Sequence, residues 1–273
     1  MTRGRWLLAL LALAFAASWV VPGFMAEQHL PNPDLTMRLA PPSEMPPFGA
    51  DDRGRPLLDY ALQGAGVVGI PALVAGLLVA LLGITGGLLA TVGGGRIEGV
   101  VAAAGELVGA LPRMMVVLVV ALLVPRDARG LMPIALTWAL LAAPGAMDEA
   151  AAVASRLGGA RFVEALRAHG FSRSRILLYH VVGLNLRPVV VRQGAETMMQ
   201  VVFLEIALSY LAIAERQGSF THSDDTHSWA SLLDLGYKVV LDLPSWHALG
   251  LGLGLIALVA VTAVTASAAA RAR

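Results

Sequence analysis

Few residues of this chain have types and spacings that could support catalysis or metal binding. Neither a Ser-His-Asp set nor an HExxH motif is recognisable, and zero cysteines exclude disulfides, thiol catalysis and cysteine-bound metal. The strongest ligand candidates are His222 and His227, which flank Asp224 and Asp225 in one polar segment. We favour a solvated loop for this cluster over a divalent-cation site, so no metal site is predicted.

The chain is not expected to hydrolyse ATP. The phosphate-binding loop of ATPases needs a lysine in the pattern G-x-x-x-x-G-K-[ST]. The single lysine, Lys238, follows Tyr237, and the glycine-rich stretch TVGGGRIEG contains none. A net charge of +1 without a basic stripe gives no indication of nucleic-acid binding. The sequence therefore predicts that the chain is neither an enzyme nor the holder of a cofactor.

Three ionisable residues lie inside long apolar runs, where a charge is costly and usually faces a protein interior or a partner. They are Glu106, Arg113 and Glu205. Glu106 and Arg113 are seven residues apart and would share one face of a continuous helix, which Pro112 could bend. These two residues could line a pathway, but we favour a structural pair or side chains that reach the membrane surface.

The composition predicts a membrane protein. The chain has 273 residues, of which 57% are hydrophobic and 14% charged, whereas soluble domains carry about 25% charged residues. Helices are expected, because a membrane span must satisfy its backbone polar groups internally. The first run could be a cleaved signal peptide, but its length favours a retained span. The six predicted spans are Trp6–Phe24, Gly64–Val92, Val100–Val124, Leu131–Met147, Thr197–Ala214 and Trp246–Ala266.

The distribution of charge predicts how these spans are oriented. Segment 148–192 has seven arginines, whereas segment 25–62 has six acids and three arginines. Positive residues collect on the cytoplasmic side, which predicts cytoplasmic N- and C-termini in a bacterial inner membrane. We expect one domain, 1–273, with segment 148–192 in the cytoplasm. Segments 25–62 and 215–245 are expected on the opposite side.

Segment 148–192 also predicts a helix, a hinge and a second helix. Residues 160–169 place Phe162, Val163 and Leu166 on one face of a short helix. Gly170 is suited to end this helix, because glycine tolerates the left-handed conformation. Ser172 is a candidate N-cap for a helix over 173–182. Periodicity alone would also fit an amphipathic helix at a membrane surface.

The stretch EALRAHGFSRSRILLYHVV resembles the EAA loop in permease subunits of ABC importers. Glu164, Ala165 and Gly170 occupy the positions of the pattern, and Leu166 stands for its second alanine. Gly183 replaces the usual proline, and because both residues disrupt helices, a break there could persist by another route. The resemblance implies an ATPase-docking helix. Its contact and hinge residues would be Arg161, Phe162, Glu164, Ala165, Leu166, Arg167 and Gly170.

Three further stretches resemble the dipeptide, oligopeptide and nickel branch of that family. PPFGADDRGRPLLDY resembles its Phe-Gly-Thr-Asp-x-x-Gly-Arg-Asp signature, EIALSYLAIA its Glu-Ala-Ala-Leu-Ser-Phe pattern, and HSWASLL its Pro-Ser-Trp-Gly pattern. Ala50 and Pro56 depart from the first signature, and the family's usual C-terminal ending is missing. The positions that match are Phe48, Gly49, Asp51, Gly54, Arg55, Glu205, Leu208, Ser209, Leu211, Ser228 and Trp229.

The resemblance implies an all-α permease fold of the MetI-like type with six transmembrane helices. It also implies a second homologous permease, two ATPase subunits that bind ATP and magnesium, and an extracytoplasmic substrate-binding protein. The cargo would be peptides, nickel complexes, opines or related solutes. Glu205 and Ser209 could then serve in the pathway or in assembly. A transport-inactive scaffold or regulator is the first alternative, and a secondary carrier is disfavoured because no internal repeat is evident.

Overall fold

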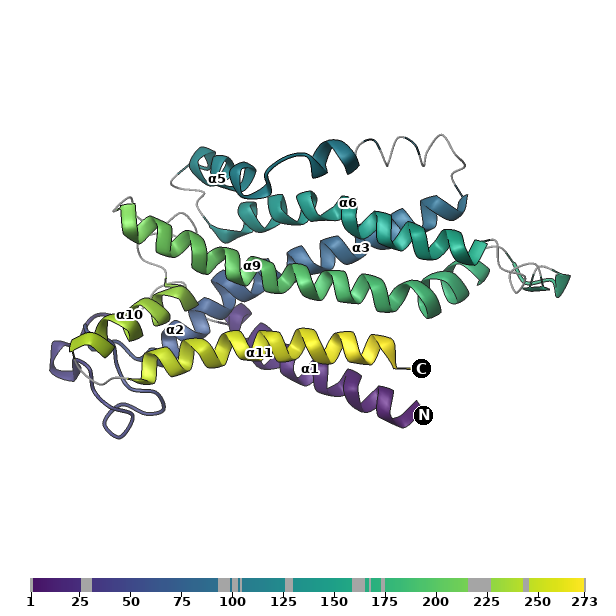
Figure 1. Cartoon of the computed structure of the whole chain (residues 1–273). Coiled ribbons are helices and arrows are strands. Elements are labelled where there is room, and N and C mark those ends of the chain that lie inside the picture. Colours follow the sequence, from purple (N-terminus) through teal and green to yellow (C-terminus); the bar gives the residue numbers. More distant parts are fainter. Residues whose placement is uncertain are drawn as a thin grey trace.

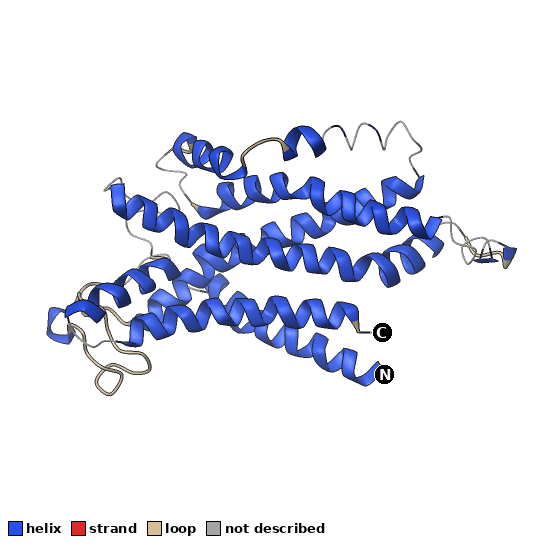
Figure 2. Cartoon of the chain, viewed as in Figure 1, coloured by secondary structure: helices blue, strands red, loops and turns tan. Residues whose placement is uncertain are grey.

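The protein is described by a computed structural model in which the regular elements of the described residues are helices (Figures 1 and 2). Some of these residues are described by their backbone alone. The structure describes residues 2–25, 31–92, 99, 103, 105–125, 130–158, 165–166, 168–172, 175–215, 227–242 and 246–272.

Long helices dominate the chain, and two of the helical segments are π-helical. α2, η2 and α3 follow one another without interruption, as do η4 and α9. The elements are α1 (Thr2–Met25), η1 (Leu35–Met37), α2 (Leu57–Gly64), η2 (Ala65–Gly69), α3 (Ile70–Val92), α5 (Arg113–Leu123), α6 (Leu131–Gly158), η4 (Ile176–Leu186), α9 (Arg187–Glu215), α10 (Trp229–Asp242) and α11 (Trp246–Arg271).

The bundle has two distinct ends (Figure 1). The N-terminus, the C-terminus and the described part of segment 165–175 lie at one end, which we call the terminal end. Segment 31–56, α2 and α10 lie at the other, which we call the signature end. The separation predicted from charge, with both termini and the arginine-rich segment on one side, agrees with this arrangement.

Within the described residues, four helices are long and apolar enough to cross a membrane, so the chain is a multi-pass membrane protein. Their spanning parts are Gly4–Met25, Leu57–Leu89, Leu131–Ala154 and Trp246–Arg271. α9 is also long, but Glu196, Gln200 and Glu205 make it more polar than these four. The prediction of six apolar spans is therefore confirmed for four.

The predicted third span, Val100–Val124, is not one continuous helix. Helical residues 105–109 end in a turn at Ala110, and α5 begins only after Pro112. Proline lacks the N–H that would continue the helix, which explains the interruption. Glu106 and Arg113 are both exposed and lie on opposite sides of this break. The prediction that they share one helix face was therefore wrong.

α6 and α9 extend further into segment 148–192 than the predicted spans did. α6 continues to Gly158 and η4 begins at Ile176, so much of segment 148–192 is helical. Gly183 lies within η4, which runs uninterrupted from Ile176 to Leu186. The expected break at Gly183 is absent from this segment, because the chain adopts the wider π-helical winding there instead.

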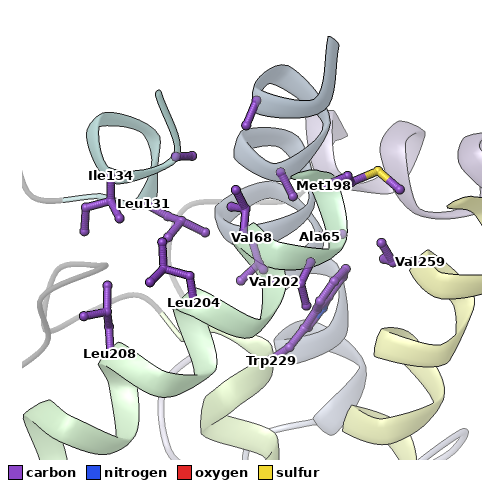
Figure 3. Packing of buried hydrophobic residues seen from close by; sticks show 14 of the residues in the cluster. Ala65, Val68, Leu131, Ile134, Met198, Val202, Leu204, Leu208, Trp229 and Val259 are labelled. Carbon is purple, nitrogen blue, oxygen red and sulfur yellow. The ribbon is translucent and has the colours of Figure 1, made fainter. Parts of the chain in front are cut away.

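The main core forms where the helices cross near the signature end. Trp19 and Trp229 are its largest buried side chains. Figure 3 shows Trp229 of α10 among core residues of η2, α9 and α11, with core residues of α6 further away. Glycines permit the closest crossing: a Cβ on Gly76 of α3 would lie 2.5 Å from the carbonyl oxygen of Gly194 of α9, and the reverse distance is 2.6 Å. Small residues thus set the spacing of these helices.

Gly83 and Gly87 of α3 lie at close helix contacts. A Cβ on Gly83 would lie 3.2 Å from Val190, and one on Gly87 would lie 2.6 Å from the end of Leu186. Val190 belongs to α9 and Leu186 to η4. α3 therefore packs closely against η4 and α9 toward the terminal end.

Candidate functional site

The carboxylate of Asp51 organises the loop at the signature end. It is fully buried and accepts hydrogen bonds from the backbone N–H of Arg53 (2.8 Å), the backbone N–H of Arg55 (2.7 Å) and the hydroxyl of Tyr60 (2.5 Å). Charged acceptors form the stronger class of hydrogen bonds. Asp51 belongs to the stretch that resembles the family signature. It thus closes a turn and links that turn to α2.

Glycine is required at Gly54 for both conformation and space. Its φ is +76°, and a Cβ there would overlap the carbonyl oxygen of Asp34. The N–H of Gly54 donates to the carbonyl of Asp51 at 3.2 Å, while the N–H of Leu57 donates to the carbonyl of Gly49 at 2.9 Å. The glycines of the signature therefore shape a compact backbone turn, and Phe48 lies exposed at its edge.

Two signature stretches that are far apart in sequence meet at α2. The backbone N–H of His227 donates to Gln63 Oε1 (2.8 Å), and the indole N–H of Trp229 donates to the carbonyl of Ala61 (3.2 Å). The ring of His227 also packs edge-on against Tyr60 at 4.8 Å between centroids. We call Asp51, Tyr60, Gln63, His227 and Trp229 the signature junction.

Glu205 is a buried carboxylate beside this junction. Ser209, one turn further along α9, donates a hydrogen bond to Oε1 of Glu205 at 2.9 Å. Ser228 is fully buried and close to the same carboxylate. Oε2 of Glu205 and the hydroxyl of Ser228 nevertheless form no hydrogen bond of standard geometry with the described residues. The side chain of Glu205 thus lies on the side of α9 that is close to the start of α10.

The described part of the arginine-rich segment confirms its predicted local structure. Gly170 has a φ of +79°, and the N–H of Phe171 donates to the carbonyl of Leu166 at 3.1 Å. This left-handed glycine and backbone bond end a helix. Ser172 accepts a hydrogen bond from the N–H of Arg175 at 3.4 Å, as an N-cap does. Arg161, Phe162, Glu164 and Arg167 lie outside the described residues.

A network of charged side chains joins α9 to α6 close to the terminal end. Arg192 of α9 contacts both carboxylate oxygens of Glu149 of α6, at 2.5 and 2.6 Å. Gln193 donates to the same carboxylate, and Arg192 also pairs with Glu196 at 2.6 Å. Arg192 and Glu149 keep 38% and 35% of their side chains exposed. We call Glu149, Arg192, Gln193 and Glu196 the α9 network.

Arg187 ties the first residue of α9 to the last turn of α11. Its guanidinium donates to the carbonyl of Ala270 at 2.8 Å and reaches the carbonyl of Ala272 at 3.5 Å. A cation is favourable at a helix C-terminus, where backbone carbonyls lack partners. α9 thus begins between α6 and α11, held by a different arginine on each side.

Sequence reasoning found the signature residues individually but missed Glu149, Arg187 and Arg192 as partners. It counted the two arginines only as indicators of orientation. A signal did exist, because a carboxylate and a guanidinium inside the ends of apolar helices usually face each other. Of the four residues His222, Asp224, Asp225 and His227, which the sequence assigned to a solvated loop, the structure describes only His227. Among the described residues, no group of three potential ligands could hold a metal ion.

The fold defines an all-helical, multi-pass membrane protein whose two ends differ in chemistry. No protein-family model matches the chain. It is similar to the Escherichia coli (strain K12) protein DdpC, named Probable D,D-dipeptide transport system permease protein. The identity is 26% over 221 residues, which cover 78% of this chain and 68% of the relative. The predicted resemblance is confirmed: the chain is a distant homologue of a permease of the dipeptide branch.

Proposed function

We propose that this chain is a transmembrane subunit of an ATP-driven importer and forms half of its translocation pathway. The other half would come from a second homologous permease, and the energy from two ATPase subunits at the terminal end. The homology to a permease over 78% of the chain is the observation that carries this proposal. On this proposal, the terminal end faces the bacterial cytoplasm.

Residues 161–170 are the proposed docking element, which we call the coupling segment. The described residues of this segment lie at the terminal end, and the segment follows α6 and precedes η4 in the chain, which supports this role (Figure 1). Phe162 and Leu166 would fill a groove on the ATPase, while Glu164, Arg161 and Arg167 set the orientation. The left-handed Gly170 separates this short helix from the next and sets the angle between them.

The proposed cargo is a peptide or a related small solute such as a nickel complex or an opine. The relative's name, which refers to D,D-dipeptides, supports the peptide class. A binding protein would deliver the solute at the signature end, where the compact Asp51 turn offers a pre-formed surface. Glu106 and Arg113 are exposed on the single chain and are candidates for the pathway or for contact with the second permease. We assign buried Glu205 and Ser209 to assembly.

Co-purification with a co-expressed ABC ATPase subunit tests the docking role. Deletion of residues 160–170 should leave the chain in the membrane but abolish capture of the ATPase. Leu166→Glu should weaken capture, because it puts a charge into the proposed apolar contact. Ala168→Glu, on another face of the same short helix, is the matched control. A deletion variant that still retains the ATPase would contradict the proposal.

A transport-inactive scaffold is the second candidate function. The uninterrupted η4 at Gly183, where the resembling loop has a proline, is the observation that favours it. ATP-driven uptake into vesicles, measured with and without this chain, separates the two functions. A complex that binds the ATPase but supports no uptake would favour the scaffold.

A further inference from the structure

The two helices that flank the coupling segment are joined directly to each other. α6 enters the segment and η4 with α9 leaves it. Glu149 and Arg192 are 43 residues apart in sequence. Their contact holds together α6 and α9 on the two sides of the coupling segment. A force on the coupling segment would therefore reach α6 and α9 together rather than either helix alone.

We infer that the Glu149–Arg192 pair is a positioning element that makes α6 and α9 follow the coupling segment as one body. The inference rests on the proposed function, because it concerns how ATPase movement reaches the spans. On this view, neither residue touches the transported solute. Their role is to keep the start of α9 fixed relative to α6 while the coupling segment moves.

Apolar packing beneath the pair supports a single moving unit. A hydrophobic cluster separate from the main core joins α6 to η4 and α9 at this level. Its buried members are Ala150, Ala154, Val181, Leu186 and Val190. Val190 is two residues from Arg192, and Ala150 is adjacent to Glu149. The charged contact therefore lies next to a buried apolar interface, and both join the same helices.

The geometry of α9 suits it to carry a displacement to the signature end. It is continuous for 29 residues, a length of roughly 44 Å at the usual rise per residue. Pro188 lies at the junction of η4 and α9, where the π-helical winding changes to α-helix. Buried Glu205 is on the same helix, beside the signature junction. The α9 network and the junction are thus joined by one rigid element.

An ordinary surface ion pair is the competing explanation, since half-exposed pairs contribute little to stability. The arrangement here differs, because Glu149 accepts from a guanidinium nitrogen and from the Gln193 amide together. Such convergent, charge-assisted contacts fix orientation more than a single pair does. A test must therefore measure transmission of movement, which a purely stabilising role would leave unchanged.

The experiment uses the full complex with its ATPase subunits in proteoliposomes. The chain has no cysteine, so Phe203→Cys, at an exposed position of α9, introduces a single labelling site. The readout is the ratio of maleimide labelling rates with Mg-ATP plus orthovanadate and without nucleotide. Glu149→Gln and Arg192→Gln should each reduce this ATP-dependent change about fivefold or more, as expected for loss of coupling between linked sites.

Three controls distinguish lost coupling from lost assembly. ATPase co-purification and ATP hydrolysis should be unchanged in both variants. Asp148→Asn alters the neighbouring exposed carboxylate and should retain the full labelling response. The double variant Glu149→Gln/Arg192→Gln should respond like either single variant, because both changes remove the same contact. If Arg192→Gln is not inserted, Arg192→Lys with Glu149→Asp carries the test, because these keep both charges but weaken the geometry.

Labelling that responds to ATP equally in the wild-type background and in both single variants would overturn the inference. Additive losses in the double variant would also overturn it, because the residues would then act separately. The same holds if ATP changes no labelling in a complex that retains its ATPase. Failure to capture the ATPase at all would instead count against the proposed function.

Discussion

The signature junction and the α9 network are both polar, but they are built in opposite ways. At the junction, a fully buried aspartate binds backbone N–H groups of its own loop, and an indole is enclosed by η2, α9 and α11. In the network, long side chains of α6 and α9 meet while about a third of each remains exposed. Backbone partners cannot move independently of the chain, whereas exposed side chains can exchange partners.

This difference indicates which end of the molecule can change shape. Loss of a buried acceptor leaves donors without partners, which strongly resists any rearrangement of the junction. The half-exposed network loses less on opening, because water can replace its contacts. We therefore expect the signature end to hold its shape while the helices at the terminal end adjust.

The largest effect is expected from Asp51→Ala. This change removes the acceptor for two backbone N–H groups and the Tyr60 hydroxyl, and should lower the free energy of unfolding by about 3–5 kcal/mol. Thermal unfolding in detergent would measure it. Asp52→Ala, at the adjacent exposed position, is the control and should change little. Equal losses in the two variants would remove the basis for calling the junction rigid.

Two glycine substitutions test the same difference in rigidity between the signature end and the terminal end. A Cβ on Gly64 would overlap the enclosed Trp229 ring, so Gly64→Ala should cost about 1–3 kcal/mol through overpacking. Gly87→Ala, toward the terminal end, should cost less, because its close neighbour is the movable end of the Leu186 side chain. Chemical denaturation of the two variants in the same detergent would compare them. A larger loss for Gly87→Ala would reverse the proposed order of rigidity.

Salt should separate the two regions. Arg192→Gln should lower the free energy of unfolding by about 1 kcal/mol or less at low ionic strength. That difference should nearly vanish at about 1 M salt, where charges are screened within about 3 Å. The loss caused by Asp51→Ala should persist, because its partners are buried. Melting temperatures of the three proteins at both salt concentrations provide the test, and a salt-independent effect of Arg192→Gln would contradict it.

The smallest effect concerns pH at the edge of the signature end. Asp34 accepts hydrogen bonds from the hydroxyl (2.6 Å) and, with a smaller effect, the backbone N–H (3.0 Å) of Thr36, and both lower the pKa of its carboxyl. Because the folded-state pKa is depressed, this stabilisation is present above the ordinary aspartate pKa and is lost as pH falls through the lowered value. Thr36→Val should return the pKa of Asp34 toward its ordinary value. Carbon-13 NMR titration of labelled aspartate would detect this, and an unchanged titration would refute it.

The sequence by itself determined the features that depend on neighbouring residues. Apolar runs predicted six membrane-crossing helices, of which four are confirmed. Gly170 and Ser172 marked a helix end and a helix start, and four stretches indicated the permease resemblance. These are local properties, because hydrophobic periodicity and backbone preferences are set by residues within a few positions of one another.

Only the tertiary structure decided which distant residues meet. It joined Tyr60 to His227 and Glu149 to Arg192, and it interrupted the third apolar run at Pro112, where composition alone indicated a continuous span. Such pairings depend on how close glycines such as Gly76 and Gly194 let two helices approach and on how those helices are rotated. No short stretch of sequence specifies the rotation, because it is settled by the packing of all the helices together.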